Sequence, residues 1–237
     1  MKDEIYRSEA GGRFEFSPDV ARVFEDMIRR SVPGYGLTLT AVQALAGMEC
    51  EAGDEVYDLG CSLGACMQAA WQGVRGRRVT IHGIDSSPAM VDRAREMLAG
   101  KEGLHVHQGD AATWAMSSAK LILMNFTLQF VPVSQRVALL TRCHEALRPG
   151  GVLFLSEKFV SQSDPDEQWL RELHWQFKRQ QGYSELEIAR KREALEEVLV
   201  PESPETHLSR LREAGFVQVT QVLQCLNFGS WVARKAA

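Results

Sequence analysis

The sequence contains no apolar run that approaches the roughly 20 residues needed for a membrane-spanning helix. Its first segment, MKDEIYRSEAGGRFEF, also has no apolar stretch of the kind found in secretory signals. The formal net charge is −4, so the chain as a whole lacks the positive charge that attracts nucleic acid. We therefore expect a cytoplasmic protein that contacts neither membranes nor nucleic acid directly.

Cysteine is also sparse, and its spacing is irregular. The five residues are an odd number and include no CxxC pair, which predicts reduced thiols instead of disulfide bonds or a zinc site. They are Cys50, Cys61, Cys66, Cys143 and Cys225. His105 and His107 in the segment HVH would share one face of a strand, but no third ligand clusters with them, so we expect no metal ion.

The chain does contain a regular alternation of strand-like and helical segments. A length of 237 residues suits one large α/β domain spanning 1–237. The alternation predicts a mostly parallel, seven-stranded sheet with helices on both faces. The predicted strands are EVYDLG, VTIHGID, LHVHQGD, KLILMNF, VLFLSEKF, FVQVTQVLQC and NFGSWVARK, the last two forming an antiparallel edge.

Helical segments precede and interrupt this pattern. Ser17 and Pro18 begin a pair of N-terminal helices over about 17–49, which the PGYG segment breaks. A charged helical insertion covers about 161–203. Between two predicted strands, the helix SQRVALLTRCHEALRPGG should end at its Pro-Gly-Gly segment.

Polar residues end four consecutive predicted strands. In an open α/β sheet, ligands bind beyond the carboxyl ends of the strands. Gly60 and Gly64 in YDLGCSLGA allow a close backbone approach before a helix N-terminus. The next three strands end at Asp85, Asp110 and Asn125. Asp85 can accept hydrogen bonds from ribose hydroxyls and Asp110 from an adenine amino group, so the set indicates a nucleoside ligand.

The segment GYSELEIARKREALE places a cation close to an apolar helix face. Its SELE sequence predicts a capping box at the start of the helix. Ile188, Leu195 and Leu199 then form an apolar stripe, and Arg192 lies within or beside it. Two interpretations are open: a surface arginine paired with Glu196, or an arginine that binds a ligand.

The strand-end residues occupy the cofactor positions of the Rossmann-like class I S-adenosylmethionine-dependent methyltransferases, which the chain resembles through Asp58, Gly60, Gly64, Asp85 and Asp110. Over nearly its whole length it resembles one family more narrowly, the carboxy-S-adenosyl-L-methionine synthases. The matching blocks are MIRRSVPGY, VYDLGCSLGA, NFTLQF, LSEKF, FKRQQGYSELEIARKR, ETHLSRLREAGF and NFGSWVA. Most of these blocks lie outside the generic fold pattern, so the resemblance is specific.

This resemblance implies an enzyme that converts S-adenosylmethionine and prephenate to carboxy-S-adenosyl-L-methionine, with release of phenylpyruvate and water. A tRNA carboxymethyltransferase would then use the product to modify the wobble uridine of tRNA. The ligand positions of the family fall on Tyr35, Gly60, Cys61, Ser62, Ser86, Ser87, Asp110, Ala111, Asn125 and Arg192.

Arg192 and Tyr35 carry the catalytic role that the resemblance implies. A guanidinium binds a carboxylate through two parallel hydrogen bonds, and the Tyr35 hydroxyl can add a donor. In the family the arginine reaches the site from the partner subunit, which implies a homodimer. Relatives often have Asn where this chain has Ser86, so we expect a weaker contact with the ribose or adenine there.

Several alternatives stay open at this point. An ordinary methyltransferase acting on a small molecule or RNA would use the same nucleoside site, although the chain lacks an NPPY-type motif. A binding module without catalysis is a third interpretation, but the polar residues retained at the strand ends argue against it.

Cys61 has no base beside it in sequence, so we do not expect a nucleophile there. The residues that hold prephenate are not identified, and the candidates are Lys158, Arg179, Tyr183 and His174.

Overall fold

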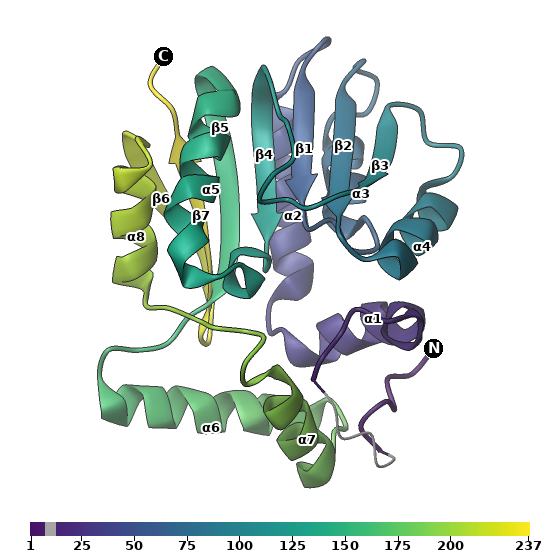
Figure 1. Ribbon diagram of the computed structural model, residues 1–237, viewed down its shortest axis with the longest axis vertical. Helices are drawn as coiled ribbons and strands as arrows, with labels where there is room; N and C mark the ends of the chain where they lie inside the picture. Colours follow the sequence, from purple (N-terminus) through teal and green to yellow (C-terminus); the bar gives the residue numbers. More distant parts are fainter. Residues whose placement is uncertain (8–12) are drawn as a thin grey trace.

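The computed structural model describes residues 1–7 and 13–237, and its centre is one seven-stranded sheet (Figure 1). The strand order is β3-β2-β1-β4-β5-β7-β6. The first five strands in this order are parallel, and β7 is antiparallel to both of its neighbours. The strands are β1 (Glu55–Leu59), β2 (Thr80–Asp85), β3 (Leu104–Gln108), β4 (Ala119–Asn125), β5 (Leu147–Lys158), β6 (Gln218–Cys225) and β7 (Phe228–Arg234). The predicted fold class, with its antiparallel edge, is confirmed.

Helices cover both faces of this sheet (Figure 1). One face carries α2 (Tyr35–Glu49), α3 (Ala65–Gly73) and α4 (Pro88–Leu98), and the other carries α5 (Val133–Ala146) and α8 (Pro204–Glu213). The central strands direct apolar side chains to both faces of the sheet, because helices cover both faces. In β4, for example, Leu121 and Leu123 belong to the first core, whereas Ile122 and Met124 belong to the second. All four side chains are fully buried.

One predicted helix boundary is wrong. Helix α5 ends at Ala146, because the Pro-Gly-Gly segment belongs to β5 and not to the helix end. Leu147 already pairs with Ala119 of β4. Pro149 disfavours helical backbone at Arg148 and offers no N–H for a helical hydrogen bond, so the chain leaves the helix before reaching it.

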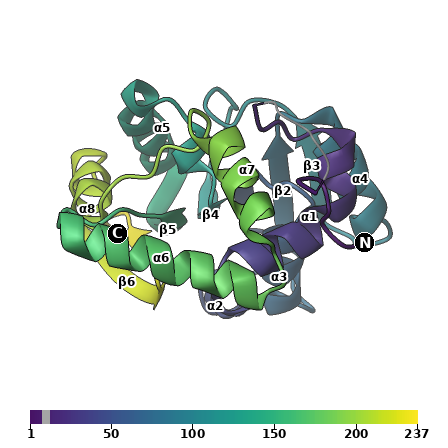
Figure 2. The same ribbon diagram turned by 90° about the horizontal axis from the view of Figure 1, so that it is seen from below.

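A separate layer of helices lies beyond the carboxyl ends of the parallel strands (Figures 1 and 2). It contains α1 (Pro18–Ser31) and the two helices of the insertion, α6 (Asp164–Gln180) and α7 (Glu185–Leu195). A hydroxyl–carboxylate hydrogen bond from Tyr183 to Asp3 ties the insertion to the N-terminal segment. The guanidinium of Arg30 adds a bond of 2.8 Å to the carbonyl oxygen of Gln181. These two contacts join the insertion to the N-terminal segment and α1 within this layer.

The N-caps predicted from the sequence for α1 and α7 are present in the structure. Ser17 accepts a hydrogen bond from the Val20 N–H, with Pro18 at the first helical position. The predicted capping box at the start of α7 is present. Helix α2 begins at Tyr35, directly after Gly34 in the left-handed region at φ +79°. The PGYG segment thus separates α1 from α2 as predicted, although Tyr35 lies in the helix and not in the turn. No helix of residues 1–7 and 13–237 combines the length and hydropathy that a membrane crossing requires.

Candidate active site

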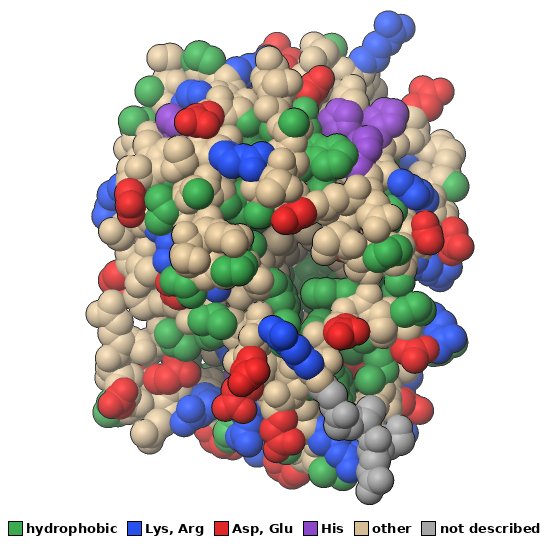
Figure 3. Space-filling view, viewed as in Figure 1, with side chains coloured by type: hydrophobic (Ala, Val, Ile, Leu, Met, Phe, Trp, Pro, Cys, Tyr) green, Lys and Arg blue, Asp and Glu red, His purple; other side chains and the backbone are tan. Residues whose placement is uncertain are grey.

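A cavity of about 760 Å³ lies between the sheet and the helical layer. The space-filling view shows a hollow with apolar side chains between these two parts of the molecule (Figure 3). Most of the predicted site residues line the cavity. They are Tyr35, Gly60, Cys61, Ser62, Asp85, Ser86, Asp110, Ala111 and Asn125.

The turn after β1 brings the backbone close to the cavity. Gly60 has φ +76°, and a Cβ there would lie 2.4 Å from the Thr127 hydroxyl oxygen, so no larger residue fits. Ser62 also lies in the left-handed region, at φ +49°. The Cys61 thiol is buried, and burial together with Asp58 and Asp85 holds its pKa well above the usual range. A thiol in this state is a poor nucleophile, which agrees with the sequence-based expectation.

Asp85, at the carboxyl end of β2, holds two neighbouring backbone segments in place. One carboxylate oxygen accepts from the Ser62 N–H at 2.8 Å, and the other accepts from the Ser87 N–H at 2.9 Å. Burial raises the pKa of this carboxyl group. Ser86 is exposed at the cavity, whereas Ser87 caps α4 and donates its hydroxyl to the Phe16 carbonyl at 2.7 Å. Ser87 is therefore placed as a structural residue and lies outside the cavity lining.

Two buried acceptor atoms at the cavity floor have no partner. Within the described chain, Asp58 Oδ2 and Asn125 Oδ1 are buried without a hydrogen bond. Burial and the charge of Asp85 raise the pKa of Asp58 to about 7. Unpaired buried acceptors cost stability, so their presence in a cavity indicates a ligand that donates hydrogen bonds. A ligand ammonium group beside Asp58 would favour the ionised form of its carboxyl group.

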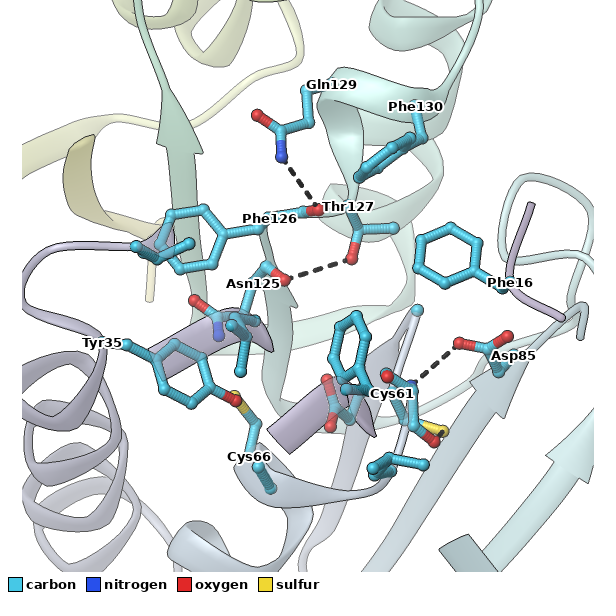
Figure 4. A pocket seen from close by; sticks show the side chains of 18 of the residues that line it. Phe16, Tyr35, Cys61, Cys66, Asp85, Asn125, Phe126, Thr127, Gln129 and Phe130 are labelled. Carbon is cyan, nitrogen blue, oxygen red and sulfur yellow. Dashed lines mark hydrogen bonds between the residues drawn. The ribbon is translucent and has the colours of Figure 1, made fainter. Parts of the chain in front are cut away.

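Tyr35 closes one end of the cavity. Its side chain is 8% exposed and points toward Cys66 and Asn125 (Figure 4). Burial is the largest of several causes that raise the pKa of Tyr35 well above its usual value. The hydroxyl is consequently neutral at physiological pH and able to donate a hydrogen bond into the cavity.

An aromatic wall that the sequence did not reveal lies near Asp85 (Figure 4). The Phe16 and Phe130 rings meet edge to face at 5.5 Å. Phe130 is held in place through Glu157, whose buried carboxylate accepts from the backbone N–H groups of Leu128 and Gln129 at 2.8 and 3.0 Å. This contact explains why the sequence blocks NFTLQF and LSEKF occur together: one supplies the turn and the other fixes it.

Arg192 is not part of the cavity in its own chain. It lies on the exposed side of α7, with its guanidinium 5.7 Å from the ring centroid of Trp175. The inner face of α7 instead carries Ile188, Lys191 and Ala194, which are buried. A role for Arg192 in the site of a second subunit stays a prediction.

The candidate residues for prephenate separate into two groups. Lys158 and His174 line the cavity, whereas Tyr183 is bonded to Asp3 and Arg179 forms salt bridges on the surface. Two further lysines line the cavity and were missed, Lys178 on α6 and Lys191 on α7. The cavity therefore has acidic side chains at the ends of β1, β2 and β3, and lysines at the end of β5 and on the insertion.

The three histidines His82, His105 and His107 lie together at the β2–β3 edge. The His82 and His107 rings stack at 5.3 Å, with 3.1 Å between Nδ1 of His82 and Nε2 of His107. Among the described residues, no three histidine, cysteine or carboxylate side chains are arranged to hold a metal ion.

Comparison with known proteins first identifies the class of protein to which this fold belongs. Residues 56–151 match the family model described as "Methyltransferase domain". Human N-acetylserotonin methyltransferase, solved in complex with SAM, superposes with a TM-score of 0.63 at 17% identity, over 93% of this chain and 56% of that one. Phosphoethanolamine N-methyltransferase 2 of Haemonchus contortus gives 0.67 at 13% identity, over 95% and 59%. The fold is thus that of the class I methyltransferases.

More similar sequences identify the family within that class. A carboxy-S-adenosyl-L-methionine synthase of Stutzerimonas stutzeri is 46% identical over 227 residues, which cover 93% of this chain and 92% of that protein. The enzyme of the same name from Aeromonas salmonicida is 44% identical over 241 aligned positions, covering 100% and 98%. The chain belongs to the carboxy-S-adenosyl-L-methionine synthase family.

Proposed function

We propose that this enzyme makes carboxy-S-adenosyl-L-methionine from S-adenosylmethionine and prephenate, with release of phenylpyruvate and water. The observation that carries the proposal is the electrostatic division of the cavity. Asp58, Asp85 and Asp110 line the cavity at the ends of β1, β2 and β3, whereas Lys158 lines it from the end of β5 and Lys178 and Lys191 from the insertion. A cationic sulfonium nucleoside suits the acidic residues, and a dianionic carboxyl donor suits the lysines.

The strand-end residues fit S-adenosylmethionine. The unpaired oxygens of Asp58 and Asn125 suit the ammonium of its methionine moiety. Asp85 retains lone pairs for ribose hydroxyls besides the two backbone bonds that it accepts. Asp110 accepts from the Ala112 N–H with one oxygen, which leaves the other for the adenine amino group. The apolar rings of Phe16 and Phe130 offer a wall for the base.

The reaction balances without a metal ion. Prephenate loses its ring carboxyl group and its hydroxyl group, and the ring becomes aromatic in phenylpyruvate. The hydroxide that leaves takes a proton from the methyl group on sulfur and becomes water. The resulting carbanion beside the positive sulfur attacks the released carbon dioxide, so a new C–C bond forms and the product carries a carboxylate.

The protein mainly positions the two reactants and excludes water. Tyr35, a buried neutral hydroxyl, would donate to the carboxylate as it forms. Arg192 would supply a bidentate partner for the same group. Since Arg192 faces away from the cavity of its own chain, we infer that it acts from the second subunit of a homodimer. In a cytoplasmic setting, the product would pass to a tRNA carboxymethyltransferase for modification of the wobble uridine.

The methyltransferase domain match keeps one alternative in view, methyl transfer to a small molecule or RNA. The nucleoside that copurifies with the protein separates the two functions by mass. Carboxy-S-adenosyl-L-methionine, heavier than S-adenosylmethionine by one carbon dioxide, supports the proposal. A preparation that holds only S-adenosylmethionine or S-adenosylhomocysteine, and that forms no carboxylated nucleoside when prephenate is added, supports methyl transfer.

A further inference from the structure

Three lysines from separate elements line the cavity and lie close enough for their charges to interact. Lys158 ends β5, Lys178 lies in the last turn of α6, and Lys191 lies on the inner face of α7. The other basic lining residues carry no free charge. Arg29 is paired with Glu25 at 3.0 Å, and burial lowers the pKa of His174 to about 3, so that its ring is neutral.

Two of these ammonium groups have no described anion in direct contact. Lys191 donates to the Ser31 hydroxyl at 2.9 Å and lies 3.7 Å from the Asp3 carboxylate. In the part of the chain that the structure describes, no hydrogen bond or salt bridge holds the ammonium of Lys158 or Lys178. Glu167 and Arg171 influence Lys158 with opposite signs. When Lys158 and Lys178 are both protonated, the cavity wall carries two positive charges that no described side chain neutralises by direct contact.

This arrangement is unfavourable without a ligand. Burial is the main cause that lowers the pKa of Lys178 to about 7, and the charges of Lys191 and Lys158 add to it. Like charges gathered in a poorly solvated wall destabilise the folded chain. A bound anion would reverse the effect, because it would supply both the missing charge and the missing acceptors.

His174 and Ser31 hold the cluster in place. The Nε2–H of His174 donates to the carbonyl oxygen of Ser31 at 2.8 Å, since a carbonyl can only accept. The Ser31 hydroxyl accepts from Lys191. His174 therefore positions Lys191 through the end of α1 and carries no charge of its own.

We propose that Lys158, Lys178 and Lys191 form the binding subsite for a dicarboxylate, the carboxyl-donating substrate. This inference rests on the proposed function and deepens it. The two ammonium groups without an ion pair match two carboxylates, and Lys191 adds a donor that Asp3 partly neutralises. The position inside the cavity that the acidic residues also line favours a small molecule held against the nucleoside over a polymer on the surface.

The binding test uses protein saturated with S-adenosylhomocysteine, which lacks the reactive methyl group, so that prephenate binds without turnover. Calorimetry should give a dissociation constant for prephenate that rises about tenfold or more in Lys178→Met and in Lys158→Met. Lys178→Arg should recover part of the loss, because it restores the charge. The matched control is Lys101→Met, since Lys101 lies outside the cavity and donates to the Met97 carbonyl. The dissociation constant for S-adenosylhomocysteine should stay within about twofold in all four variants.

Three other results are informative, and each rejects either the subsite or the proposed function. Unchanged prephenate affinity in both lysine-to-methionine variants, together with normal carboxy-S-adenosyl-L-methionine formation by the wild type, rejects the subsite alone. An equal loss of affinity for S-adenosylhomocysteine assigns the lysines to the methionine carboxylate of the nucleoside instead, which also rejects the subsite. A wild type that binds prephenate through the lysines but forms no carboxylated nucleoside rejects the proposed function and keeps the subsite.

Discussion

Lys178 is an unusual residue for the wall of a folded protein, because it is poorly solvated and has two lysines as its charged neighbours. Burial, then Lys191 and Lys158, lower its pKa to about 7 from the usual 10.5. Such groups reduce stability, and proteins retain them mainly where a ligand or a reaction requires them. Glu157, which fixes the turn after β4, therefore supports the fold, whereas Lys178 and Asp85 line the cavity and are placed to bind a ligand.

This charge has a consequence for stability that is measurable without substrate. The unfolded chain keeps the Lys178 proton up to about pH 10.5, whereas the folded chain releases it near pH 7. The unfolded state therefore binds more protons between these values, and this group makes the free energy of unfolding rise with pH over that window. Lys178→Met should melt at a higher temperature than the wild type below pH 7, and the difference should shrink toward pH 10.

Thermal unfolding of the two ligand-free proteins across this pH range checks the prediction. Lys101→Met serves as the control and should follow the wild type at every pH, because its charge lies outside the cavity. A Lys178→Met variant that is less stable than the wild type at pH 6 would mean that Lys178 is well paired in the folded chain.

At the scale of elements, one buried ion cluster joins the end of the insertion to helices α5 and α8. Arg136 of α5 is fully buried and bonds the Glu202 carboxylate, which also accepts from Arg210 of α8 at 2.7 Å. The guanidinium of Arg136 further donates to the carbonyl oxygens of Gln129 and Val200, at 3.1 and 2.9 Å. The same cation thus fixes both the turn beside the cavity and the segment that leaves the insertion.

Removing the Glu202 carboxylate should lower the free energy of unfolding. Although burial alone would raise the pKa of Glu202, hydrogen bonds from Arg210 and Arg136 lower it to about 2. Glu202→Gln leaves a buried guanidinium without its counter-ion and should lower the free energy of unfolding by about 3–5 kcal/mol at pH 7. Since the folded pKa lies below the ordinary value of 4.5, the wild type should lose this advantage as the pH falls from about 4.5 to 2.

Denaturant unfolding at several pH values measures the effect. The control is Glu213→Gln on α8, an exposed site where the change should stay within about 0.5 kcal/mol. Equal stability of Glu202→Gln and the wild type at pH 7 would show that the cluster adds nothing to the attachment of the insertion.

The elements also show what the sequence could and could not reveal. Strand ends such as Asp85 and Asn125 were predictable, because parallel strands bring their carboxyl ends to one edge. The lysine cluster was not, because its members come from β5, α6 and α7 and each reads singly as a solvated charge. On α7 the buried side falls on Lys191 instead of Arg192, because Ile188 is buried together with Lys191 and Ala194, whereas Leu195 of the predicted stripe is only partly buried.

At the scale of the whole molecule, the exposed position of Arg192 allows a direct test of the proposed homodimer. Asp85→Ala should lose about 1.5–3 kcal/mol of nucleoside binding, and Arg192→Ala should weaken the carboxylated nucleoside far more than S-adenosylmethionine. Mixing the two weak variants creates heterodimers. If Arg192 acts across the dimer, one of the two sites in each heterodimer has both an intact Asp85 and a partner with Arg192.

Steady-state rates of the mixture show whether Arg192 acts across the dimer. Random exchange of subunits should restore about a quarter of the wild-type activity. No gain over the average of the separate variants, in a mixture in which heterodimers are shown to form, would place Arg192 in the site of its own chain or outside catalysis. A protein that stays monomeric would contradict the homodimer itself.

The central claim is that the carboxyl group of prephenate becomes the carboxyl group of the nucleoside. The most direct measurement incubates ligand-free protein with S-adenosylmethionine and prephenate carrying ¹³C in its ring carboxyl group, after treatment with a chelator. The account predicts that mass spectrometry finds the label in carboxy-S-adenosyl-L-methionine, formed in step with phenylpyruvate. An unlabelled nucleoside product, or phenylpyruvate without any carboxylated nucleoside, would contradict it.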